Sequence, residues 1–418
     1  MPLVGLRERL SQARGGGSAS GMRASPRWRA WVERCVDDLH SRRLNRSLDA
    51  VSPIEGTAAA GHAASRLLHL FATNDYLGLS THPAVRATAA AVAAAHGCGP
   101  RASALVCGHT PQHRELEREL AALKQAEAAL LFPTGYAANL AVLGALADSS
   151  ECAIFSDALN HASLVDGARL AARGAGAALH VYRHGDLTQL RALLRASDAP
   201  RKLIVSDSLF SMDGDVADVR GLSQLRDEHG ALLCLDEAHA TLVLGAHGGG
   251  AAEAAGVASR VDLHVGTLSK AFGAHGGFVA CAAPLRELLL SRGRPGVYST
   301  ALPLPVIAAA RAALSAATPA VRARLWHNVA EFGAAMGCTL TSPIVPIIVG
   351  ESSEALAASA RLLRAGFHVP AIRPPTVPRG TARLRVALSA AHDPEAVRAL
   401  ARELAAMGFT SKNIHGRL

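Results

Sequence analysis

The sequence has no apolar run of 18 or more residues, and only 4% of its residues are aromatic. The first absence argues against a membrane-spanning helix, and nothing near the N-terminus resembles a secretory signal. The seven cysteines are an odd number without CxxC spacing, which predicts reduced thiols of an intracellular protein. The acids in SLFSMDGD at 208–215 lack the spacing of a calcium loop, so we expect no metal ion.

The charge balance is basic but not concentrated. Lys and Arg number 43 against 34 Asp and Glu, a net charge of +9. Because aromatic residues are few and no dense Lys/Arg run occurs, the composition does not favour nucleic acid as a partner. A cofactor that carries phosphate and an anionic substrate would account for the excess. With 418 residues, 50% of them hydrophobic, the chain predicts a folded protein of two domains rather than a disordered one.

The pattern along the chain divides it into five segments. We expect a disordered arm or targeting segment, a helical segment that packs with the small domain, a large domain, a small α+β domain and a tail, at 1–29, 30–70, 71–305, 306–410 and 411–418. The helical periodicity is clearest over 27–50. The last three residues, Gly416, Arg417 and Leu418, loosely resemble a peroxisomal signal. We therefore expect a cytosolic or peroxisomal protein, with an organellar transit peptide in the first 29 residues as the open alternative.

The large segment alternates apolar strands with helical stretches. The expected strands lie at 128–132, 152–156, 179–182, 202–207, 231–236, 262–266 and 276–281. Such alternation is typical of an α/β fold with a mostly parallel, doubly wound sheet. Ligands bind at the carboxyl ends of the strands in these sheets. Asp207, Asp236 and Gly266 fall at three such ends, so the sequence predicts a site there.

Two short motifs carry the chemistry. Asp236 ends a buried strand, His239 follows three residues later, and Lys270 lies among small residues in GTLSKAFG. Pyridoxal phosphate needs a carboxylate at its ring nitrogen and an amine for a Schiff base, and a buried lysine becomes nucleophilic. An acid three residues before a histidine is common at strand ends, and most lone lysines are surface charges. The two motifs together favour a pyridoxal phosphate site.

The remaining pocket residues follow from helix starts and loops. Gly135 and Tyr136 offer free backbone amides to a phosphate, and the hydroxyl of Thr267 can reach the same anion. Taken alone, Gly135 is equally consistent with an ordinary turn before a helix. His161 begins another helix and is suited to stack on the cofactor ring, although such a histidine is more often a cap or a core residue. We expect Ser211, together with His239, to reach the ring hydroxyl.

Longer motifs resemble the α-oxoamine synthases, which are pyridoxal phosphate enzymes of fold type I. The matching runs are FATNDYLGLS, LFPTGYAANLAV, NHASLVDG, LFSMDGD, LDEAH, GTLSKAFGAHGGF and YSTALP. The similarity spans about residues 30–410. Within the family, the run at 371–392 is most similar to the branch that condenses L-alanine with a pimeloyl thioester. The resemblance implies an acyltransferase that forms a carbon–carbon bond and releases CO2 and a thiol.

The resemblance also implies roles for single residues. Lys270 would anchor the cofactor and remove the Cα proton, and His161 would stack on the ring. Arg373 would grip the carboxylate of the amino acid, for which a guanidinium fork is suited. Asn74 and Thr376 would bind the substrate beside Arg373. The family typically forms homodimers with sites at the interface, so Thr300 would reach the cofactor phosphate of a neighbouring subunit.

Some positions leave alternatives open. Sister enzymes that use glycine or serine, such as glycine acetyltransferase, aminolaevulinate synthase and the serine palmitoyltransferase catalytic subunit, share the cofactor residues. A non-catalytic partner subunit is another possibility, although such subunits often lack the lysine. The loop near Arg101 departs from the glycine-rich run of the family, and Asp207 stands where a glutamate is familiar. Arg42, Arg43 and Arg46 could meet acyl or coenzyme A phosphates, or form an exposed helical face.

Overall fold

The computed structural model describes residues 25–41, 52–53, 58–60 and 67–414. The chain divides into two units, Met1–Ala50 and Val51–Leu418. In the first, the described part is one helix, α2 (Pro26–Ser41), on which Trp28 and Trp31 pack edge to face with ring centroids 5.5 Å apart. The helix predicted over 27–50 is thus present as far as Ser41. Arg42, Arg43 and Arg46 lie outside the described residues, as do residues 1–24 and 415–418.

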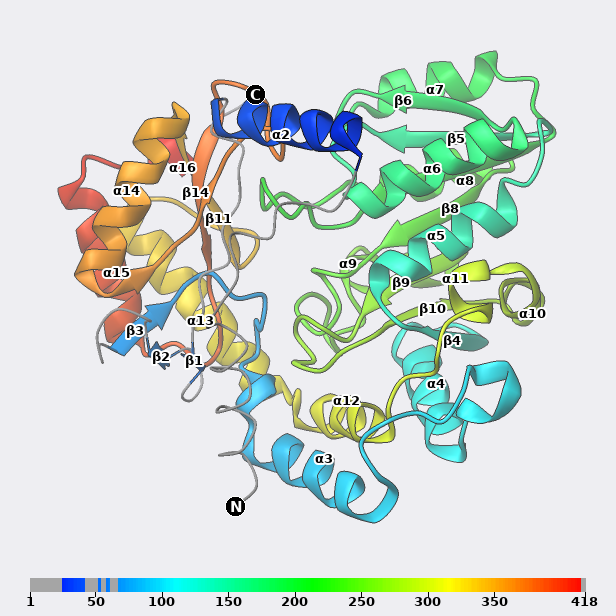
Figure 1. The fold of residues 1–418 in the computed structure, drawn as a ribbon, viewed down its shortest axis with the longest axis horizontal. Helices are drawn as coiled ribbons and strands as arrows, with labels where there is room; N and C mark the ends of the chain where they lie inside the picture. The colour runs from blue at the N-terminus through cyan, green and yellow to red at the C-terminus, as the bar shows by residue number, and fades with distance from the viewer. Residues whose placement is uncertain (1–24, 42–51, 54–57, 61–66, 415–418) are drawn as a thin grey trace. The chain divides into compact units, whose positions relative to one another are not determined.

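A seven-stranded sheet forms the centre of the second unit, with strand order β4-β10-β9-β8-β7-β5-β6 (Figure 1). Its strands are β4 (Ala128–Phe132), β5 (Cys152–Asp157), β6 (Ala178–Tyr182), β7 (Arg201–Asp207), β8 (Leu232–Asp236), β9 (Leu263–Thr267) and β10 (Gly277–Cys281). The five strands from β5 to β9 pair in parallel, whereas β10 runs antiparallel to both of its neighbours. The predicted α/β fold with a mostly parallel sheet is confirmed, and each strand lies within one residue of its expected bounds.

Helices cover both faces of this sheet, so most strand residues are buried, except on the edge strand β6, where only Tyr182 is buried. Successive side chains of a strand point to opposite sides. Leu203 and Val205 of β7 pack into one hydrophobic cluster, and Ile204 between them packs into the other. The first cluster includes α5 (Gly135–Leu146), α6 (Ala162–Ala175) and α10 (Ala283–Arg292). The second includes α4 (Pro111–Leu123), α7 (Leu187–Ala196) and α8 (Val219–Glu228). This is the doubly wound arrangement expected from the sequence.

Two smaller sheets lie outside the central one. An antiparallel sheet has the order β11-β14-β13, with bounds Ile344–Gly350, Ala382–Ala387 and Ala371–Ile372. The other has the order β1-β2-β3-β12, with bounds Ser52–Pro53, Ala58–Ala60, Leu67–Leu70 and Phe367–His368. The expected helical segment at 30–70 therefore becomes strand in the described part after residue 51. The reason is long-range pairing: β3 lies parallel to β12, and residues that far apart in the chain leave no periodic signal.

The remaining helices pack partly against these smaller sheets and partly against other helices of the same unit. They are α3 (Pro83–His96), α9 (Ala251–Ala254), α11 (Arg294–Val297), α12 (Leu304–Ala316), α13 (Pro319–Met336), α14 (Ser352–Ala365), α15 (Pro394–Ala406) and α16 (Ser411–Ile414), with single-turn helices at Leu79–Thr81, Ala104–Gly108 and Ala258–Arg260. Among the described residues, no single helix is long and apolar enough to cross a membrane. The bent pair of α12 and α13 passes that test by length and composition alone.

Candidate active site

A cavity of about 210 Å³ lies at the carboxyl ends of β7, β8 and β9. Its lining comes from the ends of these strands and from the first turns of α5 and α6. The lining residues are Thr134, Gly135, Tyr136, His161, Ser163, Asp207, Leu209, Asp236, Ala238, His239, Thr267, Ser269 and Lys270. The structure thus brings together seven residues that the sequence assigned to the cofactor. The topology explains the meeting, because parallel strands end at one edge of the sheet.

Asp236 is held in one orientation by two donors. Nδ2 of Asn139 donates to Oδ2 at 2.6 Å, and the backbone N–H of Ala238 donates to Oδ1 at 2.8 Å. Asn139 lies one turn after Gly135 on α5 and is fully buried. The sequence analysis missed Asn139, although its place four residues after the helix start put it on the same side as the cavity. A fixed carboxylate at this point can pair with a protonated ring nitrogen.

Lys270 lines the cavity beside two carboxyl groups, those of Asp207 and Asp236. Burial lowers the pKa of its amine to about 8, while Asp236 and Asp207 act in the opposite direction. A substantial share of the amine is therefore neutral near physiological pH, which is the form that attacks a carbonyl. The environment fits a lysine that binds an aldehyde.

Two neutral imidazoles face the same space. His161 caps α6, and its Nδ1 lies 2.7 Å from Oγ of Ser163. Nδ1 of His239 lies 2.6 Å from the hydroxyl of Tyr76. Burial lowers the pKa of both rings, and the nearby charge of Lys270 adds to the shift. An uncharged ring suits His161 to stack on an aromatic cofactor.

Asp207 positions His161. Its Oδ2 accepts the backbone N–H of His161 at 3.0 Å, which fixes the start of α6. Burial and the neighbouring Asp236 raise the pKa of Asp207 well above its usual range. The structure thus gives Asp207, whose role the sequence left open, a direct contact with the backbone of His161.

The N-terminus of α5 supplies the anion-binding part of the cavity. Oγ1 of Thr134 caps the helix by accepting from the backbone N–H of Ala137 at 3.0 Å. The N–H groups of Gly135 and Tyr136 lie in the first turn, where helical amides have no partner within the helix. A Cβ at Gly135 would lie 3.3 Å from Cβ of Thr267, so a side chain there would narrow the gap between helix and strand. A phosphate group fits this place.

Other predicted residues do not line this cavity. They are Asn74, Ser211, Thr300, Arg373 and Thr376. Oδ1 of Asn74 accepts from Arg385 at 3.1 Å, and the backbone oxygen of Ser211 accepts from the same guanidinium. Arg373 directly follows β13, and Thr376 is exposed. Arg385, which the sequence analysis missed, therefore joins both Asn74 and the Ser211 loop to β14.

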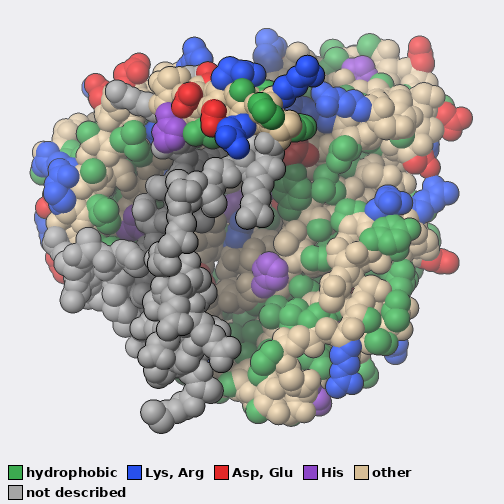
Figure 2. Space-filling view, viewed as in Figure 1, with side chains coloured by type: hydrophobic (Ala, Val, Ile, Leu, Met, Phe, Trp, Pro, Cys, Tyr) green, Lys and Arg blue, Asp and Glu red, His purple; other side chains and the backbone are tan. Residues whose placement is uncertain are grey.

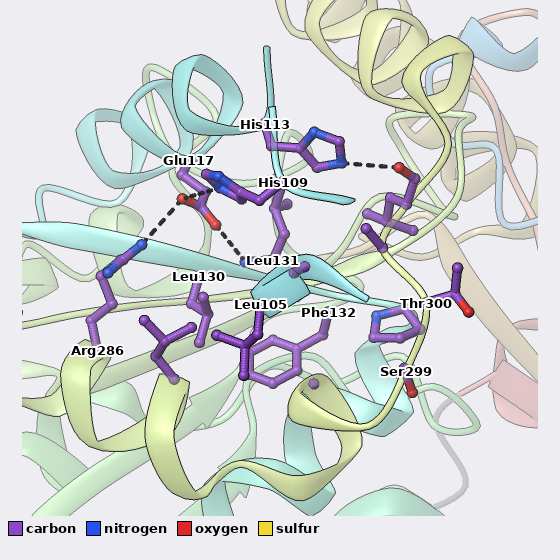
Figure 3. Close-up of a pocket in the computed structure, with 16 residues that line it drawn as sticks. Leu105, His109, His113, Glu117, Leu130, Leu131, Phe132, Arg286, Ser299 and Thr300 are labelled. Atoms are coloured by element: carbon purple, nitrogen blue, oxygen red, sulfur yellow. Dashed lines mark hydrogen bonds and ion pairs between the residues drawn. The ribbon is translucent and has the colours of Figure 1, made fainter. Parts of the chain in front are cut away.

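Thr300 lines a second cavity, of about 250 Å³ (Figure 3). Apolar side chains, among them Leu105 and Phe132, form much of its wall. Elsewhere in the wall, Oε2 of Glu117 lies 3.3 Å from Nε2 of His109, and Arg286 approaches the same oxygen at 3.4 Å. Thr300 therefore does not line the cavity that Lys270 of the same chain lines.

Comparison with known proteins agrees with this geometry. A family model described as aminotransferase class I and II matches residues 68–404. The chain belongs to this family. An 8-amino-7-oxononanoate synthase of Arabidopsis thaliana is 49% identical over 80% of this chain and 73% of its own length. One of Anaeromyxobacter dehalogenans is 49% identical over 90% of this chain and 95% of its own.

Solved structures of the family share the fold. A serine palmitoyltransferase of Sphingomonas wittichii is 31% identical, with a TM-score of 0.83 over 92% of this chain and 97% of its own. An 8-amino-7-oxononanoate synthase of Francisella tularensis is 27% identical, with a TM-score of 0.68 over 82% and 98%. These matches confirm three predictions: an α-oxoamine synthase, an enzyme rather than a non-catalytic subunit, and pyridoxal phosphate as the cofactor.

The residues of the first cavity fit that cofactor. Asp236 offers a buried carboxylate for the ring nitrogen, Lys270 an amine with a lowered pKa, and α5 an amide-rich helix start for the phosphate. These three groups match the ring nitrogen, the aldehyde and the phosphate of pyridoxal phosphate.

Proposed function

We propose that the protein condenses L-alanine with a pimeloyl thioester, giving 8-amino-7-oxononanoate, CO2 and free thiol, a step of biotin biosynthesis. The observation that carries the proposal is the cavity in which Lys270, Asp236 and His161 meet in a chain 49% identical to synthases of that name. The acyl carrier is coenzyme A or a carrier protein. Pyridoxal phosphate supplies the electron sink that makes a carbanion at Cα accessible.

Each residue near the cofactor then has a task. Lys270 anchors the cofactor and removes and returns the proton at Cα of alanine, since its pKa of about 8 suits a base at neutral pH. Asp236 keeps the ring nitrogen protonated. His161 stacks on the ring and is held in place by Asp207. His239 offers an N–H to the ring hydroxyl.

The residues proposed to bind the carboxylate of the amino acid substrate do not line the first cavity. Arg373 and Asn74, with Thr376, remain the proposed binding residues, from the resemblance of their motifs. Asn74 accepts a hydrogen bond from Arg385, and Arg385 also donates to the hydroxyl of Tyr76, which contacts His239 of the cofactor site. A carboxylate held by hydrogen bonds near this group would be oriented for loss as CO2.

We propose that the enzyme is a homodimer. Three large apolar side chains, Leu105, Val106 and Tyr298, are 54%, 77% and 73% exposed. A bridge between Ser103 and Thr300 joins the two segments that carry them, and hydrophobic side chains gather around α11 on the face seen in Figure 2. Exposed apolar groups of this kind mark protein interfaces. A partner on this surface would place Thr300 beside the cofactor phosphate of the other subunit.

The proposal is tested by product formation. Purified protein with added pyridoxal phosphate, L-alanine and pimeloyl-CoA should yield 8-amino-7-oxononanoate, identified by mass, with one CO2 and one thiol for each product. Carrier-bound pimeloyl replaces the CoA ester in a second reaction. Absence of the product from both reactions would refute the assignment. The cytosolic or peroxisomal location expected from the sequence stays a prediction.

A further inference from the structure

A buried ion pair lies directly behind the residues that face the cofactor. Nζ of Lys124, the residue after α4, lies 2.8 Å from Oε2 of Glu237, and both side chains are completely buried. Nδ1 of His264 lies 2.9 Å from the same carboxylate oxygen. The other oxygen accepts the backbone N–H of Ala252 at 3.0 Å. None of these residues lines the cavity.

The ammonium of Lys124 holds both ends of the turn that carries His239. It donates to the carboxylate of Glu237 and, at 2.8 Å, to Oγ1 of Thr241. The backbone N–H of Thr241 donates to the carbonyl of Glu237 at 2.9 Å, and its hydroxyl donates to that carbonyl at 2.8 Å. Residues 237–241 thus form one closed helical turn. A third bond, to the carbonyl of Gly249 at 2.6 Å, ties the following loop to it.

The geometry of this turn couples the ion pair to the cofactor side. In a helical turn, residues four apart lie on one face and the residue midway between them points the other way. Glu237 and Thr241 face Lys124, so His239 faces the cavity, where it is found. Asp236 precedes the turn and bonds to its second residue, Ala238. A rotation of the turn would move both cofactor contacts at once.

Stability alone does not explain two buried charges. Removing a Lys and a Glu from water costs about as much free energy as their attraction returns, and apolar pairs of similar volume often replace them without loss. Burial acts to raise the pKa of Glu237, yet Lys124 and His264 outweigh it and lower that pKa to about 2. The carboxylate is therefore charged throughout the working range of pH. The ion pair makes directional hydrogen bonds, which apolar residues cannot make.

We propose that Lys124, Glu237, Thr241 and His264 form a positioning network that fixes Asp236 and His239 against the cofactor. They are positioning residues, because they act through the turn and touch neither cofactor nor substrate. The proposal rests on pyridoxal phosphate as the cofactor and does not depend on the identity of the acyl donor. Its tests can therefore succeed or fail independently of the alanine and pimeloyl assignment.

The central test is the double substitution Lys124→Met with Glu237→Gln. It removes both charges, keeps the side-chain volumes, and leaves an amide that can still contact His264 and Ala252. We expect an apo-protein that melts close to the wild type, since no unpaired charge remains. We also expect the variant to bind the cofactor more weakly and the visible absorbance of the bound cofactor to titrate at a different pH. We expect kcat to fall by about 10²-fold, with the KM for the amino acid little changed. Wild-type cofactor affinity and spectrum in this folded variant would overturn the proposal.

Two further variants separate positioning from folding. Thr241→Val removes one hydroxyl at nearly constant shape, so it keeps the claim testable if the double variant does not fold. It should shift cofactor affinity and absorbance in the same direction by a smaller amount, and wild-type values would contradict the network. Arg226→Met is the matched control, because Arg226 pairs with Asp262 at the opposite end of β9. Arg226→Met should lower the melting midpoint without changing the absorbance of the bound cofactor. A changed absorbance would show that the loss of any ion pair alters the cofactor site, and it would contradict a specific role for the network.

Discussion

The hydroxyl of Tyr76 lies 2.6 Å from Nδ1 of His239. Nη2 of Arg385 approaches the same hydroxyl at 3.5 Å and can only donate, and Oδ1 of Asn74 lies 3.3 Å from it as an acceptor. The hydroxyl of Tyr76 therefore links His239 to Asn74 and Arg385, and its contact at 2.6 Å orients the imidazole ring. Because burial and Lys270 hold the pKa of His239 well below its usual value, the ring is uncharged at neutral pH.

Tyr76→Phe should weaken that arrangement without removing the cofactor. The ring of His239 would lose the hydrogen bond that orients it, and we expect kcat to fall about tenfold, the equivalent of one hydrogen bond to a polar partner. Steady-state kinetics over a range of pH measure the effect. Tyr182→Phe is the matched control, since Tyr182 is a buried tyrosine at the end of β6 that does not line the cavity. Equal effects in both variants would argue against a role for Tyr76 at His239.

Asp236→Asn should preserve the fold and remove most of the activity. The amide keeps the volume of the carboxylate but cannot hold the ring nitrogen of the cofactor protonated. We expect kcat to fall by roughly 10²–10³-fold, as when one preorganised electrostatic contact is lost. Asp227→Asn, an exposed position that pairs with Arg226 and Arg260, controls for removing an acid. Wild-type turnover in Asp236→Asn would refute the assigned role.

The lowered pKa of Lys270 predicts how the apo-protein captures its cofactor. Only the neutral amine attacks the aldehyde. Because the pKa is about 8 rather than 10.5, the rate of covalent capture should rise as pH increases through about 8 and level off above it. Stopped-flow absorbance of the apo-protein mixed with pyridoxal phosphate measures this rate, with Lys270→Ala as the variant that forms no covalent band. A midpoint near 10.5 would show that the amine is not perturbed.

The proposed dimer can be broken at its apolar surface. Val106→Asp places a charge on a side chain that is 77% exposed, so the isolated chain should tolerate it, whereas a buried interface should not. We expect light scattering to report a dimer for the wild type and a monomer for the variant, with weaker cofactor binding if Thr300 crosses the interface. Val181→Asp, on an exposed valine of β6 at the far edge of the sheet, is the control. A monomeric wild type would contradict the proposal.

The sequence was sufficient for the central sheet and for the residues at its strand ends. Buried strands are short apolar runs, so the bounds of β4 to β10 could be predicted within one residue. Asp236 is the last residue of β8, and Lys270 lies three residues after the end of β9. The resemblance to a known family supplied the substrates. Short strands such as β3 were not predictable, because each has few residues and because β3 also pairs with β12, about three hundred residues away.

The residues that hold the site residues in place could not be predicted from the sequence. Asn139 and Asp236 are 97 residues apart, and Tyr76 and His239 are 163 apart. Nothing in the sequence distinguishes Lys124 from an exposed lysine at the end of a helix, although its side chain is completely buried. Such contacts depend on how helices pack over the sheet, and no periodicity records that packing. The local chemistry of a site could be predicted, whereas the residues that hold it in place required the fold.

The most direct test of the assigned reaction is a competition among substrates. Equal concentrations of L-alanine, glycine and L-serine are offered to the purified enzyme with pimeloyl-, acetyl-, succinyl- or palmitoyl-CoA in separate vessels, and the products are quantified by mass. We predict that the pair of L-alanine and pimeloyl-CoA gives the highest kcat/KM and that 8-amino-7-oxononanoate dominates its vessel. A clear preference for glycine or serine, or for any of the other three thioesters, would contradict the assignment.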